Sequence, residues 1–140
     1  MFSGVAPYPI VLAKNTKASS ITGIEINPKA HKFAEENLKL NKINNVKLYL
    51  GDVKKVLPKL NKFDRIIMPL PKDAESFLDI AIKHLKKNGI IHFYDFQFEQ
   101  DIPEKTIEKI KQHCNPKIIL VKKCGQYSPR KYRVVADFKI

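Results

Sequence analysis

The chain has 140 residues, 44% of them hydrophobic and 29% charged, which is ordinary for one globular domain with a buried core. No apolar run reaches the roughly 20 residues that a membrane span needs, and the amino terminus lacks the pattern of a secretory signal. A cytoplasmic protein is therefore expected. The 26 basic and 14 acidic residues give a net charge of +12, which favours a polyanionic partner such as nucleic acid.

Two further features of the composition narrow the expectations. The basic residues are spread along the chain, so a solubilising surface is the alternative to nucleic-acid binding. Cys114 and Cys124 form neither a CxxC pair nor part of a set of four metal ligands, so we expect ordinary thiols and no metal. No internal repeat or linker interrupts the chain, which predicts one domain over residues 1–140.

The first motif in chain order is a turn of small residues, Ser3-Gly4, followed by a helix expected to begin near Tyr8. Glu25 comes about 20 positions later, at the end of the next expected strand. A turn without bulky side chains lets the backbone approach a ligand closely, and an acid in this place can accept hydrogen bonds from ribose hydroxyls. The pair predicts a pocket for a nucleoside cofactor.

Strand-like apolar segments alternate with segments of helical periodicity along the rest of the chain. Asn27 is expected to cap a helix with Pro28 in its first turn, and Phe33, Ala34 and Leu38 share one face of that helix. Asn88-Gly89 is expected to supply a left-handed stop after a later helix. The expected strands are 21–26, 46–50, 64–68, 90–96, 117–121 and 132–138, and the expected helices are 28–40, 74–85 and 104–113.

This alternation predicts an α/β fold with a mainly parallel, doubly wound sheet, because parallel neighbours need crossover connections. The last two strands differ from the others. Only a short polar segment with Gly125 and Pro129 separates them, which leaves no room for a helix. They are therefore expected to form an antiparallel hairpin.

An ordered set of motifs makes a resemblance specific. A parallel sheet that ends in an antiparallel hairpin, with acids after two successive strands, resembles the Rossmann-like fold of class I S-adenosylmethionine-dependent methyltransferases. In more detail the chain is similar to the catalytic domain of archaeal and eukaryotic tRNA (guanine-N1) methyltransferases that act beside the anticodon, and to their wybutosine-pathway relatives. The motifs are Phe2 to Tyr8, Glu25 to Pro28, Glu36-Asn37 with Leu40-Asn41, Gly51-Asp52-Val53, Asp64 to Met68 with Leu70-Pro71-Lys72, His92-Phe93-Tyr94, and Tyr127-Ser128-Pro129 with Tyr132.

The resemblance implies S-adenosylmethionine as the cofactor and a role for each motif around it. Glu25 would accept from the ribose hydroxyls, Ile26 would pack on the adenine, Asp52 would bind the adenine amino group, and Val53 would add a backbone or apolar contact. The alternatives are that Glu25 or Asp52 caps a following helix and that Ile26 belongs to the core. The residues that would line the methionine end are Phe2, Ser3, Gly4, Val5 and Pro7.

A second loop, Pro69-Leu70-Pro71, follows the expected strand 64–68, where the family carries a motif that orients the target nitrogen. Pro69 stands where a side-chain amide is expected, so main-chain carbonyls would have to provide the acceptors. Lys72 would reach an RNA phosphate, or it is simply an exposed lysine at a helix start. Asp95 is the candidate for the base that removes the proton from the ring nitrogen.

Aromatic and basic residues near the carboxyl terminus suggest contacts with RNA. Tyr94 or Phe96 could stack on a flipped base, although alternating aromatic residues on a central strand also fit a core. Phosphate contact is expected at the Tyr127-Ser128-Pro129 element, with a solvated hairpin as the alternative. The basic residues around that element are Lys122, Lys123, Arg130, Lys131 and Arg133, of which Arg130, Lys131 and Arg133 are the candidate RNA-binding residues.

The resemblance also implies that the chain is truncated at its amino terminus. In the family, tRNA-recognition domains and the first, central strand of the sheet precede the cofactor loop. That strand would lie between the strands that end at Glu25 and Met68. Either those strands pair directly, or a separate polypeptide or second copy donates a strand, or the chain is a fragment. We expect a fragment or a split arrangement.

The expected function is a SAM-dependent tRNA methyltransferase that modifies N1 of the guanosine at position 37 or its wyosine-type derivative. Transfer of an aminocarboxypropyl group in wybutosine synthesis is an alternative that keeps the fold and the cofactor. The remaining alternative is a truncated RNA-binding or partner subunit without independent catalysis.

Overall fold

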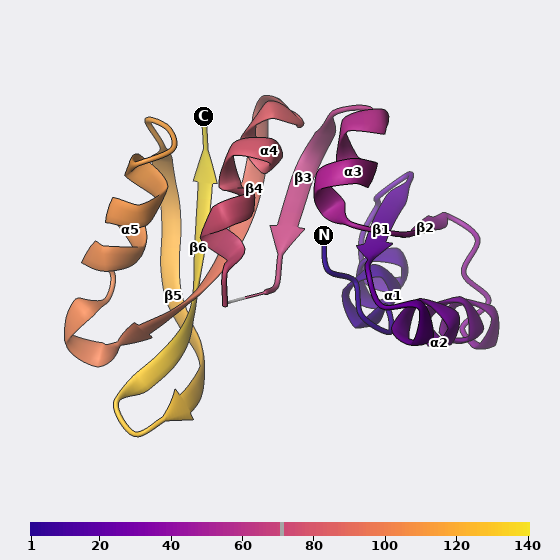
Figure 1. Cartoon of the computed structure of the whole chain (residues 1–140), viewed down its shortest axis with the longest axis horizontal. Helices are drawn as coiled ribbons and strands as arrows, with labels where there is room; N and C mark the ends of the chain where they lie inside the picture. Colours follow the sequence, from indigo (N-terminus) through magenta and orange to yellow (C-terminus); the bar gives the residue numbers. More distant parts are fainter. Residues whose placement is uncertain (71) are drawn as a thin grey trace. The chain divides into compact units, whose positions relative to one another are not determined.

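The computed structural model describes residues 1–70 and 72–140, which fall into two compact units, Met1–Lys59 and Leu60–Ile140 (Figure 1). The first unit contains α1 (Pro7–Asn15), β1 (Ile21–Glu25), α2 (Pro28–Leu40), β2 (Val46–Leu50), α3 (Val53–Val56) and the 3-10 turn η1 (Leu57–Lys59). The second contains β3 (Phe63–Met68), η2 (Ala74–Phe77), α4 (Leu78–Lys83), β4 (Leu85–Phe98), η3 (Glu99–Asp101), α5 (Glu104–Lys111), β5 (Lys117–Ser128) and β6 (Lys131–Lys139). None of the helices in the described ranges is long and apolar enough to cross a membrane.

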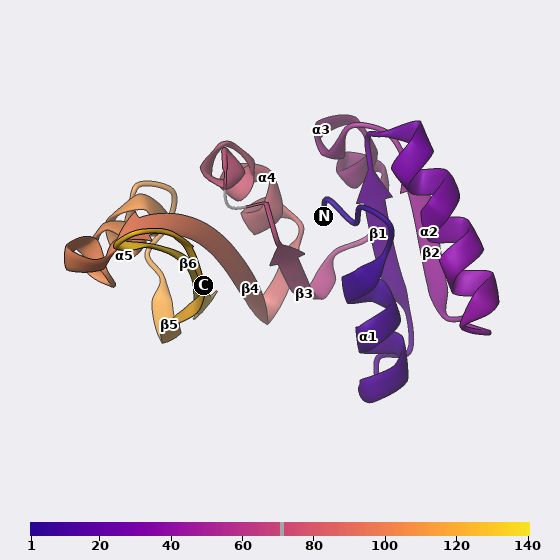
Figure 2. The ribbon, with the colours of Figure 1, turned by 90° about the horizontal axis from the view of Figure 1, so that it is seen from below.

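The first unit is a parallel pair of strands with helices packed on it (Figure 2). The two strands are in register from the pair Ile21 and Val46 to the pair Glu25 and Leu50, so their carboxyl ends lie at one edge. Apolar side chains from α1, α2 and β2 meet in a common core. Its members are Ala6, Ala34 and Leu38, with Ile10, Ile43, Val46 and Leu48 packed against them.

Helix α2 begins as the sequence predicts, with Asn27 as its cap and Pro28 in its first turn. The Oδ1 atom of Asn27 accepts from the backbone N–H of Lys29 (2.9 Å) and Ala30 (3.4 Å), and Pro28 is the first helical residue. The prediction that Phe33 belongs to the buried face of this helix is wrong, because Phe33 is 46% exposed. The narrow core of this unit is filled by smaller or more central side chains, and the Phe33 ring remains at the surface.

The second unit is a four-stranded sheet in the order β3-β4-β6-β5. β3 and β4 are parallel, whereas β6 runs antiparallel to both β4 and β5, which confirms the expected carboxy-terminal hairpin. Helices α4 and α5 lie on the same side of this sheet (Figures 1 and 2). The strand residues buried on one face are Ile91, Phe93, Asp95, Val134, Ala136 and Phe138.

Several element boundaries in the second unit differ from the sequence expectation. The helix expected over 74–85 is a 3-10 turn followed by a helix that ends at Lys83, and β4 already begins at Leu85. Asn88 is left-handed as expected (φ 64°), but it lies in an irregular part of β4, not at the helix end. Backbone pairing with Phe63 explains the early start, because the N–H of Phe63 bonds the carbonyl of His84 (2.8 Å).

β5 is also longer than its apolar segment, since it continues to Ser128 through polar residues. Its ladder with β6 includes three register irregularities, and Arg130 has a left-handed φ of 57° at the turn. Hydrogen bonding to β6 therefore extends the strand beyond the residues whose side chains predict it. The ladder of β1 and β2 and the ladder of β3, β4, β6 and β5 are two sheets, one in each unit.

Candidate functional site

The carboxylate of Glu25 is the centre of the amino-terminal site. Its Oε2 atom accepts from the backbone N–H of Gly4 (2.7 Å) and its Oε1 atom from the N–H of Asn27 (2.9 Å). Each carboxylate oxygen has two acceptor positions, so two positions remain after these bonds. The side chain is thus fixed in orientation and is still able to accept hydrogen bonds from a ligand.

The loop that contacts Glu25 has an unusual backbone. Phe2, Gly4 and Ala6 all have left-handed φ angles, of 54°, 54° and 70°. Such angles are uncommon for residues with a Cβ atom, and they concentrate in functional loops. At Gly4 the space around a Cβ position is open, so a ligand has room to approach the backbone there.

Two contacts hold this loop on β1. The N–H of Ser3 bonds the carbonyl of Ile24 (2.9 Å), and the Ser3 side chain lies over Gly23, where an added Cβ would be 3.1 Å from Ser3 Oγ. The Ser3 hydroxyl is buried and has no hydrogen-bond partner in the described part of the chain. The Nδ2 group of Asn37 on α2 donates to the carbonyl of Val5 (3.0 Å), which ties the loop to the helix.

Asp52 follows the neighbouring strand at the same edge. The N–H of Gly51 bonds the carbonyl of Glu25 (2.8 Å), so the ends of β1 and β2 are joined next to both acids. The Oδ1 atom of Asp52 caps α3 by accepting from the N–H of Lys54 (2.8 Å). Its Oδ2 atom accepts from none of the described residues, so helix capping occupies only one of the two oxygens.

The other predicted cofactor residues are divided between surface and core. Ile26 is 67% exposed, which excludes the alternative that it belongs to the core. Val5 and Pro7 are exposed beside the loop, whereas the side chain of Val53 is buried, so Val53 offers only its backbone. All nine predicted cofactor residues therefore belong to one unit, at or near the carboxyl ends of β1 and β2.

The loop expected to orient the target follows β3 in the second unit. Met68 is buried at the end of the strand, Pro69 is half-buried and Leu70 is exposed. Pro71 lies outside the described residues. Lys72 is exposed, as both of its alternatives require.

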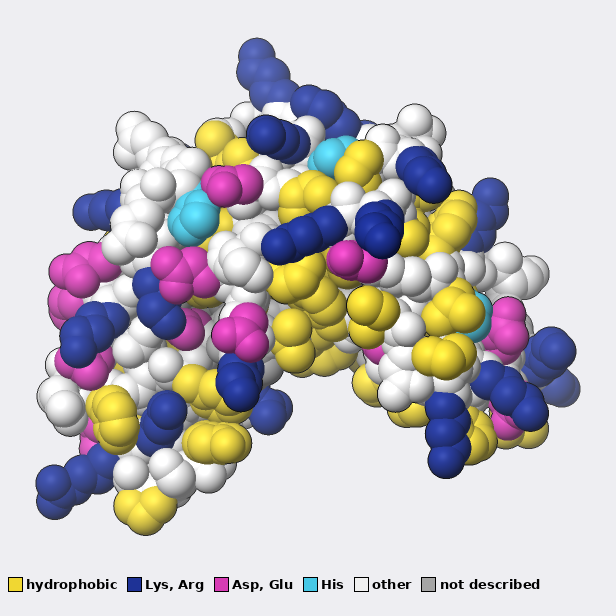
Figure 3. Space-filling view, viewed as in Figure 1, with side chains coloured by type: hydrophobic (Ala, Val, Ile, Leu, Met, Phe, Trp, Pro, Cys, Tyr) yellow, Lys and Arg dark blue, Asp and Glu magenta, His cyan; other side chains and the backbone are white. Residues whose placement is uncertain are grey.

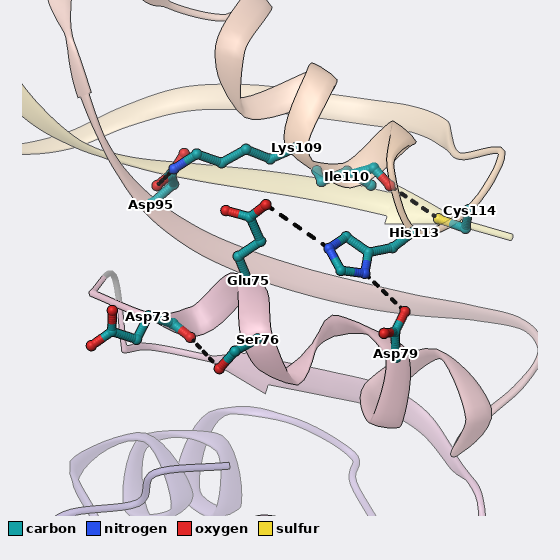
Figure 4. Close-up of polar contacts among 9 residues, drawn as sticks. All are labelled: Asp73, Glu75, Ser76, Asp79, Asp95, Lys109, Ile110, His113 and Cys114. Atoms are coloured by element: carbon teal, nitrogen blue, oxygen red, sulfur yellow. Dashed lines mark hydrogen bonds and ion pairs between the residues drawn. The ribbon is translucent and has the colours of Figure 1, made fainter.

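Asp95 has a different environment from Glu25. It is 3% exposed, and its carboxylate accepts from the N–H of Phe96 (2.8 Å) and from Nε2 of Gln97 (2.7 Å). Two residues of α5 add bonds. Oγ1 of Thr106 donates at 3.1 Å. Nζ of Lys109 donates at 2.8 Å (Figure 4). Four donors fill the acceptor positions of this carboxylate, which favours a structural role in fixing α5 on β4.

The structure also brings together a group that sequence reasoning missed. Nδ1 of His113 is 2.8 Å from Oδ1 of Asp79, and its Nε2 is 4.0 Å from Oε1 of Glu75 (Figure 4). An open pocket of about 460 Å³ lies beside this histidine. No local signal predicts the group, because His113 is more than 30 residues from both acids in the chain. The pocket is lined by Asp73, Glu75, Ser76, Gln112 and His113.

The predicted RNA-binding residues Arg130 and Arg133 are exposed, and Lys131 is half-buried at the start of β6. None of the three forms an ion pair with a described acid, whereas nearby Lys123 is paired with Glu99 (2.7 Å). On the face that Figure 3 shows, Lys and Arg side chains are spread over both units. Ion pairs involve only a few of the Lys and Arg side chains in the described residues, so the hairpin shares its unpaired cations with the rest of the surface.

The remaining candidates give no further site. Cys114 and Cys124 are free thiols, and partial burial raises the pKa of each, which makes the reactive thiolate less available. Within residues 1–70 and 72–140, no cluster of three or more His, Cys, Asp or Glu side chains is arranged to hold a metal ion.

Comparison with known proteins identifies close relatives. The chain is 42% identical to the tRNA (guanine(37)-N(1))-methyltransferase Trm5b of Pyrococcus abyssi, over all of this chain and 42% of that protein. It is 37% identical to the tRNA(Phe) (4-demethylwyosine(37)-C(7)) aminocarboxypropyltransferase of Methanocaldococcus jannaschii, over 99% of this chain and 57% of that protein. The chain thus spans about half the length of the curated relatives it matches.

Solved structures give the same picture of the fold. The crystal structure of M. jannaschii TYW2 in complex with AdoMet superposes with a TM-score of 0.90 at 36% identity, over 99% of this chain and 66% of that one. The complex structure of aTrm5 and tRNALeu superposes with a TM-score of 0.88 at 34% identity, over all of this chain and 40% of that one. These matches confirm the expected class of fold.

A family model agrees with these similarities. The model described as the TRM5/TYW2 methyltransferase domain matches residues 1–122, from the cofactor loop into β5. It therefore covers the Glu25 and Asp52 motifs and the loop after β3 in their expected order. The chain belongs to the TRM5/TYW2 methyltransferase domain family.

Proposed function

We propose that the chain is the catalytic domain of a tRNA methyltransferase that transfers a methyl group from S-adenosylmethionine to N1 of guanosine 37 or of its wyosine-type derivative. The observation that carries this proposal is the arrangement of Glu25, whose carboxylate is fixed by two backbone N–H groups and keeps two acceptor positions. The two hydroxyls of a ribose are donors, one for each of these acceptor positions. A carboxylate at this strand end is the usual partner of a ribose in such folds.

The residues around Glu25 fit the rest of the cofactor. Ile26 offers an exposed apolar side chain for the adenine, and Asp52 offers one unused carboxylate oxygen for the adenine amino group. The backbone of Val53 is adjacent. Phe2, Ser3, Gly4, Val5 and Pro7 form the loop that would hold the methionine end, where Gly4 leaves open space. When bound, the cofactor supplies an activated methyl group on a sulfonium.

The second unit would hold the substrate. Main-chain carbonyls of Pro69, Leu70 and Pro71 would orient the target nitrogen, since no side-chain amide is present in this segment. Lys72, Arg130, Lys131 and Arg133 would contact RNA phosphates. Asp95 is not proposed as the base, because four donors, two on β4 and two on α5, occupy its acceptor positions. The chain would then accelerate transfer mainly by holding the reactants in line.

Calorimetry with S-adenosylmethionine tests the cofactor site. Replacement of Glu25 by Gln keeps the size of the side chain and turns one acceptor into a donor, so the affinity should fall by about 10- to 100-fold. Glu35→Gln, an exposed change on α2, is the matched control and should leave the affinity unchanged. Equal affinities of the parent chain and Glu25→Gln would overturn the ribose assignment.

Aminocarboxypropyl transfer is the second candidate function. It is favoured by the similarity to the M. jannaschii aminocarboxypropyltransferase, which covers 99% of this chain, while the similarity to Trm5b covers all of it. The mass of the tRNA product after incubation with the cofactor separates the two, because the transferred groups differ greatly in mass. If neither product forms and tRNA binding is retained, the result would instead support a non-catalytic subunit.

The comparisons give no support to a separate chain that supplies an amino-terminal half.

A further inference from the structure

One end of the four-stranded sheet carries a cluster of aromatic rings. The Phe96 ring of β4 and the Tyr127 ring of β5 contact each other, with centroids 4.4 Å apart and planes tilted by 41°. Phe98, two residues farther along β4, is 47% exposed and Tyr127 is 63% exposed. These rings lie together and are not scattered singly, and it is contiguous apolar surface that marks an interaction site.

A lysine joins these rings into one surface. Nζ of Lys131 is 5.9 Å from the ring centroid of Phe96, 5.4 Å from that of Phe98 and 5.8 Å from that of Tyr127. Each distance is within the range of a cation–π contact. We call Phe96, Phe98, Tyr127 and Lys131 the hairpin platform.

The strand register places the platform on a single face. Phe96 is opposite Arg133, and Phe98 is opposite Lys131, so these side chains point to the same side of the sheet. Asp95 and Val134, the buried pair, point to the other side, where α5 packs. Lys122 pairs with Val135 and adds another exposed cation to the platform face.

The positive charge on this face indicates the kind of partner that it fits. Lys131 and Arg133 form no ion pair with a described acid, and the chain carries a net charge of +12. Lys123 shows the contrast on the opposite face, where it lies over the Tyr132 ring (4.2 Å) and is paired with Glu99. Exposed rings combined with unpaired cations match a polyanion that also presents flat bases.

We propose that the hairpin platform binds unpaired nucleotides of an RNA, with bases stacked on Tyr127 and Phe98 and phosphates near Lys131, Arg133 and Lys122. This inference rests on the proposed tRNA-modifying function. The rings supply stacking, which tolerates any base, and the cations supply attraction to the backbone. The platform would therefore hold the single-stranded part of the substrate without reading its sequence.

A binding experiment with two polyanions tests the platform. The probes are a fluorescent anticodon stem-loop RNA and heparin, which carries charge but no bases. The double change Phe98→Ala with Tyr127→Ala should weaken RNA binding about tenfold or more and leave heparin binding unchanged. Tyr127→Phe should bind RNA like the parent chain because it keeps the ring. The change Lys131→Gln should weaken binding of both probes and flatten the salt dependence of RNA binding.

Phe33→Ala is the matched control, because Phe33 is 46% exposed in the other unit and should not affect RNA binding. RNA binding of the double variant within twofold of the parent chain would overturn the proposal. If the double variant lost RNA binding and heparin binding equally, the rings would contribute no base stacking, and this result would also overturn the proposal. A dimer of the parent chain that the double variant dissolves, seen by size-exclusion chromatography, would make the platform an interface between copies.

These affinities are measured without S-adenosylmethionine. A failure of cofactor binding or of group transfer would remove the proposed function and would leave the affinities unaffected. If the platform proposal is wrong, the variants that remove the Phe98 and Tyr127 rings will bind RNA like the parent chain, whatever the result of cofactor binding. Circular dichroism of each variant shows whether the fold is retained. If the double variant unfolds, the single change Tyr127→Ala at the more exposed ring, compared with Tyr127→Phe, keeps the test valid.

Discussion

Strand β1 of the first unit and strand β4 of the second unit each carry a carboxylate, Glu25 and Asp95, and the two differ in what surrounds them. Glu25 is half-buried and accepts one backbone N–H at each oxygen, while Asp95 is buried and accepts from four donors. The backbone donors orient Glu25 without consuming its remaining acceptor positions. The donors around Asp95 consume them. A strand-end acid is therefore a candidate ligand only if its acceptor positions are open.

The largest expected effect is at Asp95, where the comparison predicts a loss of stability. Asp95→Ala leaves Gln97, Thr106 and the partly exposed Lys109 without their acceptor, which should lower the free energy of unfolding by about 3 kcal/mol. Denaturant unfolding followed by circular dichroism measures it. Glu108→Ala removes an exposed acid from the same helix α5 and should change stability by less than about 0.5 kcal/mol.

The result that contradicts this interpretation of Asp95 is a stable Asp95→Asn variant that binds S-adenosylmethionine and RNA normally and transfers nothing. Such a variant would show that the carboxylate takes part in the reaction. If Asp95 is structural, the amide should lower stability, because it replaces one acceptor by a donor next to Lys109 and Gln97. Transfer by the folded fraction should persist.

A smaller effect is expected at the support of the cofactor loop. Asn37→Ala removes the bond from Nδ2 to the carbonyl of Val5, which should lower stability by about 1 kcal/mol. The loop that presents Gly4 to Glu25 would be less constrained, so affinity for S-adenosylmethionine should fall several-fold. Calorimetry measures this change. Asn15→Ala, which removes an exposed side-chain bond to Val11 at the end of α1, is the control.

If Asn37→Ala and Asn15→Ala gave the same cofactor affinity, Asn37 would have no role in holding the loop. Of the residues around the loop, only Glu25 would then remain as a candidate contributor to cofactor binding. A loss of affinity without a loss of stability would instead indicate that the Asn37 side chain contacts the ligand directly.

The smallest effect concerns Asp64, an exposed acid with a single partner. The hydrogen bond from Lys86 (2.8 Å) lowers the pKa of the Asp64 carboxyl from its usual value. Because the folded pKa is depressed, the pair stabilises the fold above the unfolded pKa, and this stabilisation is lost as the pH falls through the folded pKa. An NMR titration should show a higher midpoint for Asp64 in Lys86→Ala and in high salt. Identical midpoints in all three conditions would mean that the pair is not formed in solution.

Local signals in the sequence were enough where a structural element depends on its own residues. Asn27 and Pro28 determine the start of α2, and the carboxyl ends of two parallel strands must meet, so Glu25 and Asp52 were expected at one edge. The roles of these acids toward a cofactor remain predictions. Boundaries that depend on a neighbour were less predictable, because pairing with β6 extends β5 through polar residues to Ser128.

The sequence by itself determined the alternation of strands and helices, the hairpin at the carboxyl terminus and the family, because periodicity, capping residues and ordered motifs are properties of the chain. Only the tertiary structure decided which acids are occupied and which rings are exposed. Asp95 has partners 11 and 14 residues away on α5, and Phe96 of β4 meets Tyr127 of β5 across β6, whose ladder with β5 is irregular. Such contacts depend on how helices pack and strands align, and no local pattern encodes that alignment.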